Sequence, residues 1–207
     1  MASPIVAITG ASGSVYGVRL IRCLIDRGLN PYVVISDSGK TVMRLELGTD
    51  KLIDLVGYRG YQVEEIKNFA APFSSGSFPT QGMAVAPCSM GTLAAIAHGL
   101  SQNLIHRAAD VCLKEKRKLI IVPREMPMHL GHLRNLATVA EFGATVIPAM
   151  PAFYQKPETM DDLVDTVVAR ILDHLGVEHN LVERWRGDLI EEDPLRTLEK
   201  EFLDGEL

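Results

Sequence analysis

The chain has 207 residues, a length typical of one domain, and 47% of them are apolar and 23% charged, which is enough apolar material for a full core. The three cysteines are an odd number set in apolar segments, so we expect reduced thiols in a cytoplasmic protein rather than a disulfide framework. No basic segment precedes the first apolar run, and no run approaches ~18 apolar residues, which predicts neither a signal peptide nor a membrane span.

The net charge of −5 is concentrated near the C-terminus. Residues 186–207 contain eight acidic and three basic side chains, which account for the whole net charge and leave residues 1–185 neutral. We therefore expect one domain over residues 1–185 and an acidic tail over residues 186–207. A neutral domain argues against nucleic acid as a partner, because phosphate contacts require a basic surface.

Short apolar runs alternate with amphipathic segments along the chain. We predict strands over 5–9, 32–36, 83–86, 119–122 and 145–147, and helices over 15–27, 40–47, 91–97, 104–116 and 132–142. Residues 48–67 fit neither pattern, and the serine- and proline-rich segment 68–81 is predicted to be an irregular loop. The last helix has the clearest limits, because Thr159 is a good N-cap and Gly176 a good stop.

The predicted strands are apolar throughout rather than alternating. That pattern indicates burial on both faces and therefore a mainly parallel sheet covered by helices. Because crossover connections are right-handed, we expect an α/β, doubly wound, Rossmann-like fold with helices on both faces of the sheet. In such a fold ligands bind at the C-terminal ends of the strands.

The loop after the first strand, TGASGSVYG, has the character of an anion site. Its glycines permit a sharp turn and a close approach to a ligand, and Ser12 and Ser14 add hydroxyls at a helix N-terminus. The dinucleotide fingerprint fails, because Ser12 and Val15 stand where it requires glycines. Asp37, after the second strand, is placed to hold a ribose hydroxyl, so a nicotinamide dehydrogenase stays open, as does a plain turn without a ligand.

The loop PCSMGT also follows a predicted strand and opens a helix. Ser89, Gly91 and Thr92 offer hydroxyl and backbone donors there. Cys88 has the chemistry of a nucleophile, but no partner histidine is identifiable. We therefore interpret it as a small buried thiol.

Arg124 and Glu125 follow the strand over 119–122, between two prolines. A doubly wound fold brings ligands to this edge, so we favour a functional role over ordinary surface charge. His129 and His132 have a helical i, i+3 spacing that suits two metal ligands. No third ligand has a convincing spacing, and we expect no metal site.

Three further side chains near the C-terminal end of the domain stand out, and the first two each have two possible interpretations. Tyr154, in a proline-rich loop, is either a ligand contact or a packed aromatic. Arg170, among the apolar residues of the last helix, either extends its charge to solvent or binds a phosphate. Trp185 is the only tryptophan of the chain, in a position where an isolated surface side chain would serve no purpose.

Six segments together carry a resemblance to a known family. TGASGSVYG, SSGS at 74–77, PCSMGTL, NLIHRAADVCLKEKRKLIIVPRE, PMHLGHLRN and PAFYQKP resemble the UbiX-type flavin prenyltransferases in order and spacing, over roughly residues 5–185. Related flavoproteins that decarboxylate peptidyl cysteine have a PASANT-like loop where this chain has PCSMGT. The resemblance is therefore to the prenyltransferase branch.

The resemblance implies transfer of a dimethylallyl group from dimethylallyl monophosphate to N5 and C6 of reduced FMN, without a metal. The product, prenylated FMN, would serve UbiD-type decarboxylases, and the family usually forms dodecamers, which implies a homo-oligomer. The implied FMN contacts are Gly10, Ala11, Ser12, Ser36, Ser89, Met90, Gly91, Thr92 and Arg124. The implied contacts to the prenyl phosphate are Tyr154, Arg170, Arg124 and Lys114. The implied catalytic residues are Ser12, Glu46, Lys114, Glu125 and Trp185.

Two other functions stay open on the sequence. An FMN-dependent oxidoreductase or decarboxylase would turn over flavin without a prenyl donor, and a non-catalytic flavin carrier would bind FMN without making a new product. The residue types favour the transferase, because arginine and lysine stabilise a phosphate leaving group and an aromatic face such as Trp185 stabilises an allyl cation. Glu125 or the released phosphate would accept the proton lost at C6.

Overall fold

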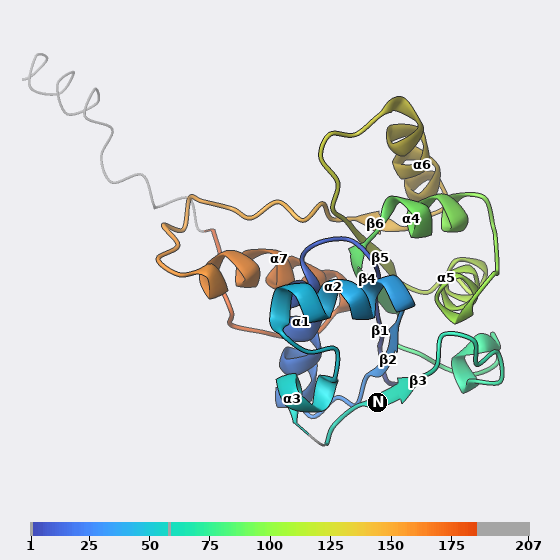
Figure 1. Ribbon diagram of the computed structural model, residues 1–207, viewed down its shortest axis with the longest axis horizontal. Helices are drawn as coiled ribbons and strands as arrows, with labels where there is room; N and C mark the ends of the chain where they lie inside the picture. Colours follow the sequence, from blue (N-terminus) through green and yellow to red (C-terminus); the bar gives the residue numbers. More distant parts are fainter. Residues whose placement is uncertain (1, 58, 186–207) are drawn as a thin grey trace, which may run out of the picture.

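The computed structural model describes residues 2–57 and 59–185. Its strands form one parallel sheet in the order β3-β2-β1-β4-β5-β6 (Figure 1). The strands are β1 (Ile5–Ile8), β2 (Tyr32–Ile35), β3 (Gln62–Glu64), β4 (Met83–Cys88), β5 (Leu119–Pro123) and β6 (Thr145–Val146). The helices are α1 (Ser14–Asp26), α2 (Asp37–Leu47), α3 (Leu52–Val56), α4 (Met90–Ala97), α5 (Leu104–Lys114), α6 (Leu130–Glu141) and α7 (Met160–Leu175).

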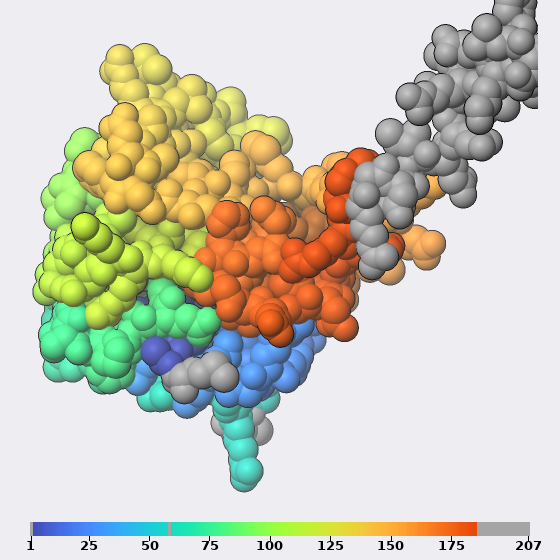
Figure 2. Space-filling model, turned by 180° about the vertical axis from the view of Figure 1, so that it is seen from behind, coloured from blue at the N-terminus to red at the C-terminus, as the bar shows by residue number. Residues whose placement is uncertain are grey.

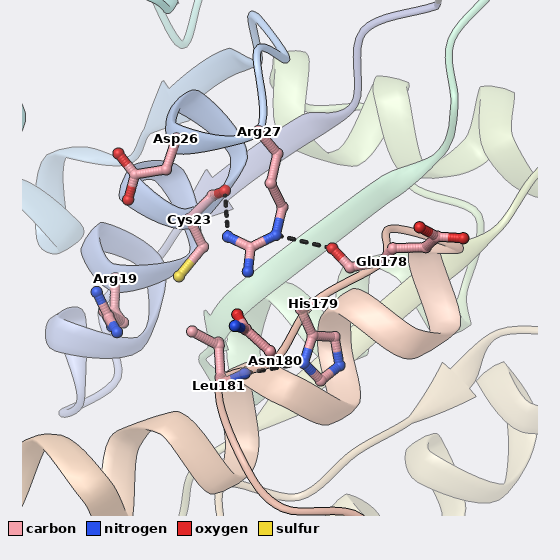
Figure 3. Close-up of a pocket in the computed structure, with 8 residues that line it drawn as sticks. All are labelled: Arg19, Cys23, Asp26, Arg27, Glu178, His179, Asn180 and Leu181. Atoms are coloured by element: carbon pink, nitrogen blue, oxygen red, sulfur yellow. Dashed lines mark hydrogen bonds between the residues drawn. The ribbon is translucent and has the colours of Figure 1, made fainter.

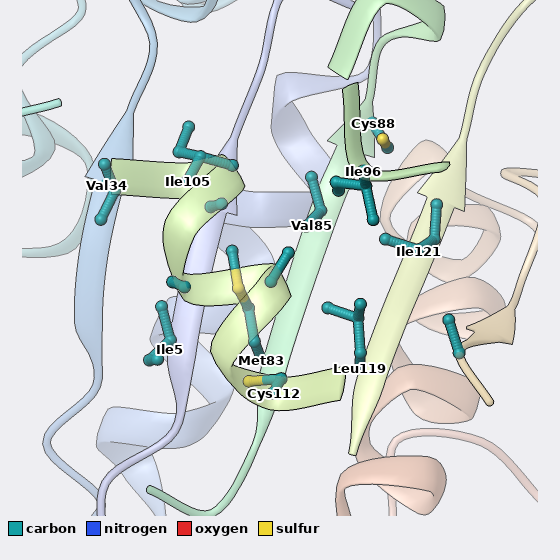
Figure 4. Close-up of a cluster of buried hydrophobic side chains, with 14 of the residues drawn as sticks. Ile5, Val34, Met83, Val85, Cys88, Ile96, Ile105, Cys112, Leu119 and Ile121 are labelled. Atoms are coloured by element: carbon teal, nitrogen blue, oxygen red, sulfur yellow. The ribbon is translucent and has the colours of Figure 1, made fainter. Parts of the chain in front are cut away.

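Helices cover both faces of the sheet, which confirms the doubly wound α/β fold. Alternate residues of β1 face opposite cores: Ile5 and Ala7 pack beneath α4 and α5 (Figure 4), whereas Val6 and Ile8 pack beneath α1 and α7. Each central strand is therefore buried on both sides, which is the physical reason for its unbroken apolar sequence.

The predicted and observed elements differ mainly at the ends of helices, which are set by a capping hydrogen bond or by the backbone conformation of one residue. Helix α2 begins three residues earlier than expected, because the Ser36 hydroxyl accepts a hydrogen bond from the Gly39 N–H at 2.9 Å and caps it. Helix α5 ends at Lys114 because Lys116 adopts a left-handed backbone with φ of 53°. The ambiguous segment 48–67 contains α3 and the edge strand β3.

Helix α7 has the limits expected from the sequence. The Thr159 hydroxyl accepts a hydrogen bond from the Asp162 N–H at 3.1 Å, and the Asp162 carboxylate accepts one from the Thr159 N–H at 2.8 Å. This reciprocal capping box starts the helix, and Gly176, with φ of 76°, ends it. No helix within the two described ranges is long and apolar enough to cross a membrane. The acidic tail expected over 186–207 lies outside those ranges.

The strand order reverses between β1 and β4, where one connection leads to β2 and the other to β5. Thr9, which follows β1 and is 1% exposed, fastens the two strands at this point. Its hydroxyl donates to the Pro87 carbonyl at 2.8 Å and accepts from the Ser89 N–H at 2.8 Å. The loops after β1 and β4 are therefore held together at the crevice where such folds bind ligands.

Replacing Thr9 with valine should destabilise the protein, because valine keeps the shape but leaves the Ser89 N–H without this partner, while the Pro87 carbonyl keeps only the Thr9 N–H at 3.2 Å. We expect a loss of roughly 1–3 kcal/mol in the free energy of unfolding, measured by denaturant titration. Thr9→Ser, which keeps the hydroxyl, is the matched control. Equal stability of the valine and serine variants would contradict this account of the crevice.

Candidate active site at the carboxyl edge of the sheet

The loops that follow β1, β2, β4 and β5 meet at the carboxyl edge of the sheet. Gly10 lies so close to the start of α2 that a Cβ atom there would be 2.5 Å from the Ser38 hydroxyl. The Ser38 hydroxyl in turn lies 3.1 Å from that of Ser36. On the other side, the Arg124 N–H donates to the Cys88 carbonyl at 3.3 Å. Four segments far apart in the sequence thus form one site.

The side chain of Glu46, on α2, reaches the N-terminal end of α1. Its carboxylate accepts hydrogen bonds from the backbone N–H groups of Gly13 at 3.0 Å and Ser14 at 2.8 Å. Burial opposes its ionisation, but hydrogen bonds from the Ser12 hydroxyl and from these two N–H groups outweigh that effect and lower the pKa of Glu46 below its ordinary value. The anion expected at this helix N-terminus is therefore a side chain of the protein itself, and it lies beside Ser12.

The start of α4 has free space instead. The Ser89 hydroxyl caps the helix by accepting from the Thr92 N–H at 3.4 Å, and the two hydroxyls lie 3.1 Å apart. A Cβ atom at Gly91 would meet no atom within 4 Å. Met90 and Ala11 are both 7% exposed, so they can reach a ligand mainly through their backbone.

Arg124 lies near the first turn of α1 as well as the start of α4. Burial raises the pKa of the Tyr16 phenol, and the nearby Arg124 guanidinium partly offsets that rise. Glu125, the next residue, is exposed, and one of its carboxylate oxygens accepts a hydrogen bond from the Met126 N–H at 3.1 Å. The site therefore holds one cation between two helix starts and one solvent-facing carboxylate beside it.

A flavin mononucleotide suits the residues at this edge. The buried Ser14 hydroxyl lies near the Glu46 carboxylate and helps to lower its pKa, so the room for a ligand is at the start of α4 rather than at Ser14. The free space beside Gly91 and the hydroxyls of Ser89 and Thr92 lie at a helix start, which favours a phosphate. Together these features fit a ligand that carries both polar groups and an anion.

Three side chains with reactive chemistry, one thiol and two imidazoles, have other surroundings. Cys88 is fully buried, and burial raises the pKa of its thiol far above the ordinary value, so the prediction of an inert thiol agrees with its surroundings. The rings of His129 and His132 stack with centroids 3.6 Å apart. Across residues 2–57 and 59–185 no three metal-binding side chains come together.

The residues expected at the prenyl group gather elsewhere in the protomer. Tyr154 and Trp185 contact each other edge to face, with ring centroids 5.4 Å apart. Tyr154 also borders a cavity of about 440 Å³ formed by residues 154–158, the first half of α7 and residues 181–183. Arg170, on the second half of α7, forms an ion pair with Asp173 at 2.7 Å. In Figure 2, α7 and the residues up to Trp185, in orange, make up one continuous surface.

Lys114 is not near Arg124 in one protomer. It ends α5 where β5 is about to begin, whereas Arg124 follows the far end of that five-residue strand, a span of about 16 Å. The Lys114 ammonium instead lies against Gly76 in the SSGS loop. Arg107, one heptad earlier on α5, donates to the Ser74 carbonyl at 2.9 Å. Sequence reasoning missed Arg107, although its i, i+7 spacing from Lys114 indicates a shared helix face.

A second cavity, of about 640 Å³, lies between one face of α1 and residues 178–181 and contains none of the expected site residues (Figure 3). Its two arginines are already engaged. Arg19 pairs with Asp165 through two hydrogen bonds of 2.7 Å, and Arg27 donates to the carbonyls of Cys23 and Glu178. This cavity therefore lacks the free cation and helix start that characterise the carboxyl edge.

Comparison with known proteins supports this view of the site. Residues 3–172 match the flavoprotein family model. The flavin prenyltransferase UbiX of Halalkalibacterium halodurans is 48% identical over 188 residues, covering 87% of this chain and 91% of the relative. The UbiX of Archaeoglobus fulgidus is 46% identical and covers 87% and 98%.

Two solved structures are similar to this chain in fold. AnUbiX (PadA1), in complex with FMN and dimethylallyl pyrophosphate, has a TM-score of 0.83 at 40% identity and covers 90% of this chain and 98% of its own. A dodecameric FMN-dependent UbiX-like decarboxylase from Escherichia coli O157:H7 has a TM-score of 0.82 at 44% identity and covers 89% and 100%. The family model, the sequence identities and the similarity of fold lead to one conclusion: this chain belongs to the flavin prenyltransferase UbiX family of flavoproteins.

Proposed function

We propose that this chain transfers a dimethylallyl group from dimethylallyl phosphate to reduced FMN. The observation that carries the proposal is the carboxyl edge itself, where the open start of α4, with the hydroxyls of Ser89 and Thr92, lies beside Arg124. Family membership supports it, and so does the relative that binds FMN and dimethylallyl pyrophosphate. The buried free thiols of Cys23, Cys88 and Cys112 suit a reducing, cytoplasmic setting.

The proposed FMN contacts divide according to what each residue offers. Ser12, Ser36, Ser89 and Thr92 offer hydroxyls, and Arg124 offers a cation near two helix starts. Gly10, Ala11, Met90 and Gly91 offer backbone groups, because their side chains are absent or buried. Backbone N–H groups at a helix start and a guanidinium are suitable partners for the phosphate of the nucleotide.

Reduced FMN supplies the nucleophilic N5 and C6 atoms. The bond between the allyl carbon and the phosphate oxygen breaks with its electron pair on the phosphate, and Arg124, Arg170 and Lys114 would stabilise that charge. The face of Trp185, held edge to face against Tyr154, would stabilise the positive allyl fragment without acting as a base. The second bond, at C6, balances only if the middle carbon of the allyl group gains a proton while C6 loses one. Glu125, exposed at the edge, or the released phosphate would carry these protons.

The negative charge of Glu46 has a distinct role in this scheme. Its carboxylate already binds the first N–H groups of α1 and lies beside Ser12. We infer that it orients the Ser12 hydroxyl toward the flavin rather than binding the phosphate, because two anions would repel each other at that helix start. The prenylated product would be released to a UbiD-type decarboxylase.

A homo-oligomer would explain why one protomer separates residues that the reaction needs together. Lys114 lies at the opposite edge of the sheet from Arg124, so a second copy would bring a Lys114 to each site. Large apolar side chains are exposed on α6 and the loops beside it, including Leu130, Leu133 and Met150, as expected of a buried contact between copies. The E. coli relative is dodecameric.

The reaction is tested by mixing pure protein, reduced FMN and dimethylallyl monophosphate without oxygen and measuring the flavin mass. We expect a flavin heavier by one dimethylallyl group, and the same assay with the diphosphate identifies the preferred donor. An unchanged flavin mass with both donors would rule out the transferase. Flavin turnover without any donor would support an oxidoreductase instead.

Glu125→Gln should retain FMN and slow prenylation by roughly a hundredfold, the usual contribution of a general base. The measurements are an FMN titration and the rate of product formation under single-turnover conditions. Glu141→Gln, an exposed carboxylate at the end of α6, serves as the matched control. Wild-type rates in the Glu125 variant would remove this residue from the mechanism and leave the proton to the phosphate.

The shared site can be tested by mixing inactive variants. Lys114→Ala and Tyr154→Phe should each lose most activity alone, whereas co-refolded mixtures should regain about a quarter of the wild-type sites, if two copies supply the two side chains at random. Activity per FMN bound and mass by light scattering are the readouts. Mixtures as inactive as the single variants would show that both side chains act within one protomer.

A further inference from the structure

Asp173, near the C-terminal end of α7, is the centre of a charged cluster of which only Arg170 has a role in the function proposed above. One carboxylate oxygen lies 2.7 Å from the Arg170 guanidinium. The other oxygen lies 2.8 Å from the Arg184 guanidinium and 3.1 Å from Nε2 of His179. The Asp173 side chain is 19% exposed, whereas both arginines are more than half exposed. One carboxylate therefore anchors two solvent-facing guanidinium groups.

The same cluster fastens the chain that follows α7. After Gly176 the segment 177–185 folds back toward the loop that precedes the helix. His179 is held at Asp173 with a side chain only 1% exposed, and the Gln155 side chain donates to the Glu183 carbonyl at 2.6 Å. Arg184 then joins Asp173, and the next residue, Trp185, contacts Tyr154. The path of this segment ends with the indole against the tyrosine ring.

The carboxylate that makes these contacts stays ionised. Partial burial opposes the charge on Asp173, but hydrogen bonds from Arg184 and His179 outweigh that effect and hold its pKa below the ordinary range. A charged acceptor forms stronger and better-directed hydrogen bonds than a neutral one, above all with the planar guanidinium of arginine.

We propose that Asp173 is a positioning residue for the prenyl donor: it orients Arg170 for the donor phosphate and, through Arg184, keeps Trp185 against Tyr154. This inference rests on the proposed function, because Arg170, Trp185 and Tyr154 are its donor-side residues. Free arginine side chains sample many rotamers, so an anchored guanidinium binds an anion with less loss of conformational freedom. Two guanidinium groups on one carboxylate also leave one positive charge in excess for the phosphate.

The first test monitors the environment of the Trp185 indole in protein without donor or flavin. Trp185 is the single tryptophan, so indole fluorescence of the flavin-free protein reports on this residue alone. We expect Asp173→Asn to shift the emission maximum to the red and to increase quenching by acrylamide, because the indole leaves Tyr154. Asp165→Asn is the matched control, since Asp165 is also on α7 but lies outside the cluster, where its side chain, 14% exposed, pairs with Arg19 of α1.

The second test measures the KM for the prenyl donor. We expect Asp173→Asn to raise the KM for dimethylallyl monophosphate by roughly tenfold, the effect of losing one charge-assisted contact, while kcat and FMN affinity change less than KM. Asp165→Asn should leave KM unchanged even where it lowers thermal stability. This split separates a positioning role from general destabilisation.

Arg184→Ala provides a second variant that is expected to fold, because its side chain is 62% exposed. It should reproduce the fluorescence change while Asp173 still holds Arg170. Unchanged Trp185 fluorescence in both Arg184→Ala and Asp173→Asn would overturn the proposal, and so would equal KM values in the Asp173 and Asp165 variants. If wild-type protein makes no prenylated flavin, the proposed function fails, and the fluorescence comparison still decides whether Asp173 positions Trp185.

Discussion

The two hydrogen bonds of the Thr9 hydroxyl hold together the point from which the flavin site is built. In a parallel sheet whose connections diverge between β1 and β4, two loops leave adjacent strands in opposite directions and open a crevice. The Thr9 hydroxyl, at the end of β1, donates to the Pro87 carbonyl and accepts from the Ser89 N–H, so it satisfies two polar groups at the end of β4 in a place that water does not reach. The starts of α1 and α4 are thereby fixed relative to each other.

Those two helix starts are chemically different, although both follow a central strand. The first N–H groups of α1 bind the carboxylate of Glu46, whereas α4 is capped by its own Ser89 and has open space at Gly91. A further anion at α1 would meet like charge, and one at α4 would not. The two sides of the crevice therefore differ: the α1 side has the fixed negative charge of Glu46, and the α4 side, near Arg124, has room for a phosphate.

The sequence indicated the architecture well and the site only in part. Unbroken apolar runs revealed the doubly wound sheet, and the rule that ligands bind at strand ends selected the loops at Thr9, Ser89 and Arg124. Glu46 was named through the family resemblance alone, because its contact with Gly13 joins residues 33 positions apart and no local pattern encodes it. The short elements α3 and β3 were missed, since five and three residues give too little periodicity.

The contacts of Asp173 show why the donor side of the site could form apart from the flavin side. Its partners Arg170, His179 and Arg184 lie 3, 6 and 11 positions away, so the cluster depends on α7 and the segment after it rather than on the sheet. The flavin side depends instead on long-range contacts between strands, such as those of Thr9. The two sides of the site therefore depend on different sets of contacts within one chain. The proposed contact between copies would bring Lys114, at the opposite edge of the sheet, to Arg124.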